Sequence, residues 1–223
     1  MECDHVIDPK LEKYEAVKAC FSKSFTCLVS GGTGSGKTTW VVQMVKSVFK
    51  KCFHDIFLII PENSLNSISE ADNVFRKYLD EEHIFHEYTP EVLQNIYDRI
   101  EANAGEGYTS LLIIDDFGAD LKSKPTELIL NRLCLKNRHL RCSTIILAQN
   151  YFMLGKKIRE IVNNVVLFNT NKSQNRKFFD EQFDFGDKQF KELMSLLKTT
   201  HDYFIINLKY KRIFFNCNEV IFD

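Results

Sequence analysis

Residues 31–38, with the sequence GGTGSGKT, fit the pattern G-x-x-x-x-G-K-[ST]. Glycines let successive backbone N–H groups turn toward one point, and they carry no Cβ that would keep an anion away. Lys37 can reach the β- and γ-phosphates of a nucleotide, while the hydroxyl of Thr38 is placed to ligate Mg²⁺. The segment therefore predicts a loop that binds the phosphates of ATP, and we call it the phosphate loop.

An apolar run precedes this loop and an amphipathic run follows it, which is the strand–loop–helix context that phosphate binding requires. A glycine loop that is merely flexible would leave the lysine and the threonine unexplained. The residues assigned to the nucleotide are Gly31, Gly32, Thr33, Gly34, Ser35, Gly36, Lys37, Thr38 and Thr39.

Two adjacent carboxylates end a second apolar run, LLIIDD, at residues 111–116. Ligand crevices of parallel sheets lie at the carboxyl ends of the strands, so Asp115 is expected in the same crevice as the phosphate loop. There it would hold Mg²⁺, directly or through water, beside Thr38. Asp116 suits the activation of an attacking water and is assigned as general base. The alternative is that Asp116 only caps the next turn.

A third apolar run, STIILA, is followed by Gln149. An amide can donate to a γ-phosphate oxygen and also accept from a water, so Gln149 suits a sensor of hydrolysis. An amide in this place could equally be only a turn residue.

These residues need a scaffold in which several strands end at one edge. Short apolar runs closed by turn residues predict buried strands, and runs with helical spacing predict helices between them. Strands are expected at 25–30, 55–60, 110–116, 143–149 and 165–170, with an antiparallel pair at 202–208 and 212–218. Helices are expected at about 37–49, 90–100, 126–135 and 187–198. The sequence thus predicts an α/β fold of the P-loop NTPase type, with a mostly parallel central sheet flanked by helices on both faces.

The chain of 223 residues is long enough for one domain, which we expect at 25–223 after a helix-bearing extension at 1–24. No apolar run is long enough to span a bilayer, and no secretory signal is visible. The seven cysteines lack metal-type spacing and are interpreted as reduced residues of an intracellular protein. His83 and His86 are expected on opposite faces of a strand, which disfavours a metal site.

Charge is unevenly distributed although the net charge is only −1. Residues 62–106 contain eleven Asp or Glu and three Lys or Arg, whereas residues 122–159 contain nine Lys or Arg and one Glu. The acidic segment is interpreted as a solvated face. For the basic segment, a solvated face and an anion-binding role are equally acceptable.

Several features around the third apolar run match one family. They are Arg138 with His139 before the run, Gln149 with Tyr151 at its end, and Lys157, Ile158 and Arg159 beyond it. With the phosphate loop and LLIIDD, residues 25–170 resemble the poxvirus-type DNA packaging ATPases, a viral branch of the FtsK–HerA superfamily. One departure is Gly155, where relatives commonly carry proline.

The resemblance implies an ATPase that forms a ring of five or six identical subunits and drives double-stranded DNA into a preformed capsid. It implies ATP and Mg²⁺ as cofactors, a capsid vertex protein as a partner, no membrane, and a place in the host cytoplasm or nucleus where virions assemble. The ATP site would lie between neighbours, and an arginine of one subunit would complete the site of the next. Arg138 is the first candidate for this residue and Arg141 the second. Either arginine could instead form a salt bridge within the subunit or contact DNA.

Lys122 and Lys124, in the loop after Asp116, are candidate contacts to DNA phosphates, with solvated surface lysines as the alternative. Three other functions remain open. They are a small-molecule kinase, a nucleotide switch without turnover, and a cellular or plasmid DNA pump. The kinase would not need Gln149, and the paired carboxylates favour hydrolysis over a switch.

Overall fold

The computed structural model describes residues 15–21, 24–69, 73–115, 117, 123–169, 171–215 and 218–221. Within them, nine strands form one sheet in the order β3-β2-β4-β5-β1-β6-β7-β8-β9. The strands are β1 (Thr26–Ser30), β2 (Asp55–Ile59), β3 (Ile84–Phe85), β4 (Ser110–Ile114), β5 (Cys142–Ala148), β6 (Asn164–Phe168), β7 (Tyr203–Asn207), β8 (Arg212–Phe215) and β9 (Asn218–Glu219).

Helices connect the strands. The α-helices are α1 (Glu15–Phe21), α2 (Lys37–Ser47), α3 (Glu62–Asn66), α4 (Val74–Tyr78), α5 (Pro90–Glu106), α6 (Lys124–Leu135), α7 (Lys156–Ile161), α8 (Lys172–Gln182) and α9 (Asp187–Leu196). Short 3₁₀ turns lie at η1 (Phe49–Lys51), η2 (Glu81–His83) and η4 (Tyr151–Met153).

The six strands from β3 to β6 run parallel, and their register brings their carboxyl ends to one edge of the sheet. Ser30 at the end of β1 lies beside Ala148 at the end of β5, while Ile114 at the end of β4 pairs with Ile146. Every residue of β1, β4, β5 and β6 is buried. Strands covered on both faces need unbroken apolar runs, which is why they are easily recognised in the sequence.

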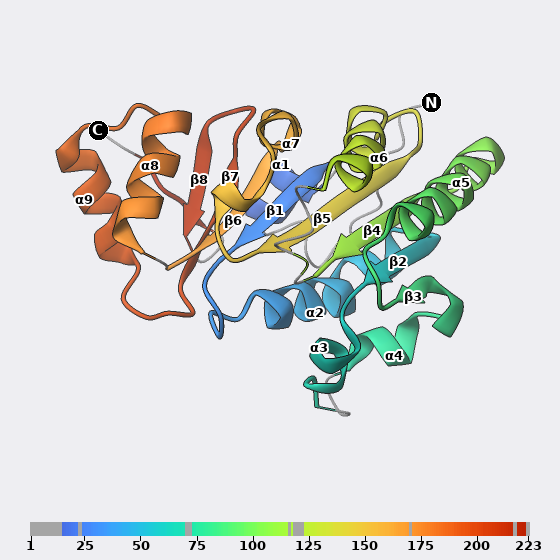
Figure 1. Ribbon diagram of the computed structural model, residues 1–223. Helices are drawn as coiled ribbons and strands as arrows, with labels where there is room; N and C mark the ends of the chain where they lie inside the picture. The colour runs from blue at the N-terminus through green and yellow to red at the C-terminus, as the bar shows by residue number, and fades with distance from the viewer. Residues whose placement is uncertain are drawn as a thin grey trace.

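Helices cover both faces of the sheet, as Figure 1 shows with α5 and α6 on one side and α2, α3 and α4 on the other. Two apolar clusters correspond to these two layers. One contains buried residues of α5 to α9, such as Ile96, Leu130 and Phe178, and the other contains residues of α1 to α4, such as Val41 and Phe75. The predicted fold class is therefore confirmed.

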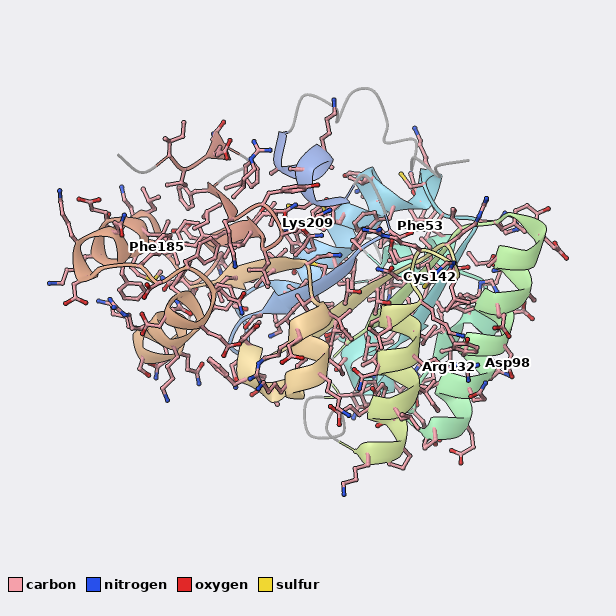
Figure 2. The ribbon with its side chains drawn as sticks, turned by 90° about the horizontal axis from the view of Figure 1, so that it is seen from above. Phe53, Asp98, Arg132, Cys142, Phe185 and Lys209 are labelled. Carbon is pink, nitrogen blue, oxygen red and sulfur yellow. The ribbon has the colours of Figure 1, made fainter. Side chains whose placement is uncertain are left out.

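The last three strands are antiparallel and extend the sheet beyond β6. Helices α8 and α9 cover them at the end of the molecule where the chain finishes (Figure 1). Phe185, between these two helices, lies at the opposite end from Asp98 of α5 and Arg132 of α6 (Figure 2). The sequence predicted the antiparallel strand pair. It did not predict that β7 pairs with β6 and so joins this pair to the parallel strands in one sheet.

Some local predictions differ from the structure. The strand expected around His83 and His86 is only the two residues of β3, because His83 belongs to η2. The His86 ring nitrogen Nδ1 lies 3.0 Å from the carbonyl oxygen of Ile60, so this ring anchors the chain next to β2. None of the helices in the described ranges is both long and apolar enough to cross a membrane.

Four cysteines, Cys20, Cys27, Cys134 and Cys142, are free and buried in the core. Burial disfavours the thiolate, and it raises the pKa of Cys20 to about 12 and that of Cys134 to about 11. These thiols therefore behave as small apolar residues of the core. Cys3 and Cys217 lie outside the described residues.

Candidate active site

The phosphate loop connects the buried strand β1 to helix α2 at the carboxyl edge of the sheet. Gly34 and Gly36 have φ values of +74° and +99°, a region that side chains other than glycine rarely enter. A Cβ on Gly31 would overlap Ser35 Oγ and lie 2.8 Å from Phe168 Cβ, so the first glycine is needed because the chain passes too close to its neighbours. Helix α2 begins at Lys37, with the free N–H groups of its first turn next to the loop.

The ammonium group of Lys37 folds back across the loop. Its Nζ donates hydrogen bonds to the carbonyl oxygens of Gly31 at 2.8 Å and Gly32 at 3.1 Å. These carbonyls hold the positive charge at the loop, where phosphate oxygens could replace them as partners.

Thr38 and Asp115 are in direct contact. Thr38 Oγ1 donates to Asp115 Oδ2 at 2.8 Å, although 77 residues separate them in the chain. Asp115 is only 3% exposed, and its backbone N–H is held by the carbonyl of Ile59 at the end of β2. The predicted magnesium ligands therefore lie side by side, Thr38 in the first turn of α2 and Asp115 just after the carboxyl end of β4.

The donor set suits Mg²⁺, because a hydroxyl and a carboxylate are the hard oxygen ligands that this ion prefers. Across the part of the chain that the structure describes, no cluster of three His, Cys, Asp or Glu side chains is arranged to hold a metal. Magnesium at Thr38 and Asp115 would thus complete its coordination with phosphate oxygens and water, as it does in nucleotide sites.

A cleft of about 520 Å³ opens beside these residues. It is lined by the predicted site residues Thr33, Gly34, Lys37, Thr38, Thr39, Asp115 and Gln149. Gln43 of α2, Ser64 of α3 and residues 67–69, which follow α3, also line it. These serine hydroxyls in the lining were not predicted, because isolated serines in and after a short helix have no pattern that marks them.

Gln149 lies at the end of β5, between the strand of Asp115 and the strand of the phosphate loop. Its side chain is exposed in the cleft, where it can meet a bound phosphate group. The register supports this position, since Gly31 N donates to Ala148 O at 3.1 Å.

The motif residues after Gln149 anchor the chain and do not line the cleft. Tyr151 is buried, and its hydroxyl donates to Glu181 at 3.3 Å and accepts from Gln182 at 3.0 Å. Burial raises the pKa of Tyr151 well above its ordinary value. The guanidinium of Arg159 lies over the Tyr151 ring, 5.5 Å from its centroid, and donates to the carbonyl of Leu154. These contacts fasten the segment that follows Gln149 to α8.

Gly155, the departure noted in the sequence, is the N-cap of α7 and has a φ of −59°, close to the value that proline fixes. A Cβ at this position would overlap the carboxylate of Glu127, the mobile end of a long side chain. A proline would therefore fit the φ observed at Gly155, provided that the Glu127 side chain moved.

Arg138 and Arg141 lie in the connection between α6 and the start of β5, at the amino ends of the parallel strands and thus opposite to the cleft. Arg138 is exposed, whereas Arg141 donates from Nη1 to the carbonyl of Gly107 in the same chain. Neither arginine lines the cleft of its own subunit. Asp116 and Lys122 fall outside the described residues, and Lys124 is exposed at the first position of α6.

A histidine that belongs to no motif of the sequence contacts the phosphate loop from the C-terminal part of the chain. His201 Nδ1 lies 3.1 Å from the carbonyl oxygen of Ser35. The two residues are 166 positions apart, so no local pattern could have connected them.

Comparisons with solved structures identify proteins of the same fold. The DNA-packaging ATPase B204 of Sulfolobus turreted icosahedral virus aligns with a TM-score of 0.58 and 18% identity, over 86% of this chain and 96% of that one. B204 of Sulfolobus turreted icosahedral virus 2, solved with sulfate, aligns with a TM-score of 0.58 and 17% identity, over 90% of this chain and 98% of that one. ATPases 2 and 3 of EccC from Thermomonospora curvata align with a TM-score of 0.54 and 14% identity, over 89% of this chain and 37% of that one.

None of the curated proteins compared with the sequence is similar enough to be reported as a relative. The sequence itself, however, matches a family model over residues 13–221, nearly its whole length, and the model is described as "Poxvirus A32 protein". The chain therefore belongs to the poxvirus A32 protein family.

Proposed function

We propose that this protein is an ATP-hydrolysing motor that moves double-stranded viral DNA into a capsid. The observation that carries the proposal is the 2.8 Å contact between Thr38 of the phosphate loop and Asp115 of β4. This contact supports the proposal because it brings together the two parts of the expected nucleotide site, in a member of the poxvirus A32 protein family. The structural relatives support it, since B204 is named as a genome packaging NTPase and was solved with ATP-γS and with AMPPCP.

The phosphate loop and the N-terminus of α2 would bind the triphosphate through backbone N–H groups. Lys37 would exchange the carbonyls of Gly31 and Gly32 for β- and γ-phosphate oxygens. Thr38 and Asp115 would hold Mg²⁺, which neutralises negative charge on the phosphates when it is bound.

Hydrolysis requires a water aligned with the γ-phosphate. Gln149, exposed in the cleft, would donate its amide N–H to a γ-phosphate oxygen and accept a hydrogen bond from that water. Asp116 would take the proton of the water as it attacks. Completion of the site by Arg138 of a neighbouring subunit requires a ring, for which we propose five or six subunits. The capsid vertex is the docking partner that such a motor needs, and the site of action is the host cell where virions assemble.

DNA dependence provides the main test. Because a motor grips the phosphate backbone through Lys and Arg, double-stranded DNA should raise the rate of ATP hydrolysis several-fold. The stimulation should fade between about 50 and 200 mM salt, because the release of counterions from DNA favours binding less as the salt concentration rises. The measurement is steady-state phosphate release with and without DNA of mixed sequence, with Lys37→Ala as the inactive control. If DNA leaves the rate of ATP hydrolysis unchanged at every salt concentration, the result would contradict a DNA motor and favour a kinase or a nucleotide switch.

Substitutions of Lys37 and Asp116 should separate nucleotide binding from hydrolysis. Lys37→Ala should lose nucleotide binding, whereas Asp116→Asn should bind ATP and hydrolyse it at least about 100-fold more slowly, the size of a general-base contribution. Equilibrium binding of AMPPCP and single-turnover hydrolysis of ATP measure the two effects. An equal loss of binding in both variants would remove the role assigned to Asp116.

A further inference from the structure

The turn between α9 and β7 reaches across the sheet edge to the phosphate loop. His201 is its point of contact, with Nδ1 at 3.1 Å from the carbonyl oxygen of Ser35. A carbonyl oxygen only accepts, so Nδ1 must carry the hydrogen of this bond. The ring also borders Gly36, since a Cβ on this glycine would lie 3.5 Å from His201 Nδ1.

The turn that presents His201 is held by several hydrogen bonds. Asn169, which follows β6, donates from its side chain to the carbonyls of Thr199 at 3.0 Å and Leu197 at 3.4 Å, and from its backbone to Asp202 at 2.9 Å. Asp202 Oδ2 accepts from the backbone N–H groups of Lys198 and Thr199, both at 2.7 Å. The bond from Thr199 is the main cause that lowers the pKa of the Asp202 carboxyl below its ordinary value. The root of the turn is therefore fixed to β6, the strand next to β1.

The peptide bond after Ser35 converts this contact into a constraint on the phosphate loop. In a planar trans peptide the C=O and N–H groups point in opposite directions. Holding the Ser35 carbonyl toward His201 therefore turns the Gly36 N–H away from it. Without such an anchor this peptide can reorient at low steric cost, because Gly36, the residue after it, has no Cβ and adopts a φ of +99° that other residues rarely enter.

We propose that His201 is a positioning residue of the nucleotide site, which holds the Ser35 carbonyl outward so that the Gly36 N–H points at a bound phosphate. This inference rests on the proposed ATPase function. It gives the C-terminal strands a role, because the turn before β7 preorganises the loop after β1. Preorganised donors bind an anion more tightly because the loop loses less freedom on binding.

Two substitutions at this position separate the hydrogen bond from the bulk of the ring. His201→Ala removes the donor, while His201→Asn places an amide nitrogen close to the position of Nδ1 and can make the same bond. We expect the Kd of the full-length protein for AMPPCP, measured by calorimetry, to rise about five- to tenfold in His201→Ala, as the loss of one hydrogen bond predicts. His201→Asn should remain within about twofold of wild type. In ATP hydrolysis, KM should rise and kcat should change little.

The melting temperature without nucleotide detects a fold defect. It should fall by no more than about 4 °C, because His201 is exposed and only one hydrogen bond is lost. If His201→Ala melts early, His201→Phe keeps a ring, lacks the donor, and should show the same weakened binding. Binding of wild-type strength in the variants without the donor, or equal weakening in His201→Asn, would overturn the role of His201 while the ATPase function stands. A wild-type protein that binds no AMPPCP would instead overturn the proposed function, and this inference with it.

Discussion

Gly31 and Gly32 are adjacent in the phosphate loop, yet their surroundings differ. A Cβ on Gly31 would meet Ser35 and Phe168, whereas a Cβ on Gly32 would find nothing within 4 Å. Gly31→Ala should therefore lower the free energy of unfolding by about 1–3 kcal/mol, the cost of overpacking a tight site. Gly32→Ala, which adds the same methyl group one residue later, should change it by less than about 0.5 kcal/mol. Equilibrium denaturation in urea measures both, and equal effects would contradict the close approach at Gly31.

Single residues of the site differ in how well the sequence predicted their position. Lys37, Thr38, Asp115 and Gln149 all line one cleft, as expected from three apolar runs that end at the same edge of a sheet. Their roles in binding and chemistry stay predictions. His201 was not predicted, because its contact depends on how the turn after α9 folds back over the loop.

At the scale of secondary structure, the sequence predicted the elements that bury unbroken apolar runs. The missed helices are short or polar. Helices α3 and α4 have five residues each and α7 has six, too few for a helical period to repeat. Helix α8 has eleven residues, but its buried positions are only Asn175, Phe178 and Phe179, which form no recognisable stripe.

The order of strands also lies beyond a sequence pattern. Strand β5 separates β4 from β1, so Asp115 reaches Thr38 across an intervening strand. Only the twist and packing of the whole sheet determine which strands are neighbours. The motifs could predict that the two residues share an edge, but not the contact between them.

At the scale of the whole molecule, the position of Arg138 decides which site it can complete. It lies before β5 begins, and the cleft lies where β5 ends. The seven residues of this strand span about 23 Å at 3.3 Å per residue, which is far beyond the reach of an arginine side chain. An arginine in this position could contact only a nucleotide that is bound to a neighbouring subunit. Such a contact requires a head-to-tail arrangement of subunits, such as a ring.

Mixed assemblies test this arrangement. Arg138→Ala subunits keep an intact phosphate loop, and Lys37→Ala subunits keep an intact Arg138, so each protein alone should have little ATPase activity. When the two are mixed in equal amounts, about a quarter of the interfaces should join an intact loop to an intact arginine. Activity should therefore recover to roughly that share of wild type, if all interfaces act independently.

The matched control is a chain that carries both substitutions. Mixed with Arg138→Ala subunits, it supplies no intact arginine to any interface, so activity should stay at the level of Arg138→Ala alone. Arg141→Ala mixed with Lys37→Ala addresses the second candidate, whose guanidinium is already held by Gly107 in its own chain. If subunit exchange is demonstrated and the first mixture stays inactive at every ratio, Arg138 does not act between subunits. Its exposed side chain would then be assigned to DNA or solvent.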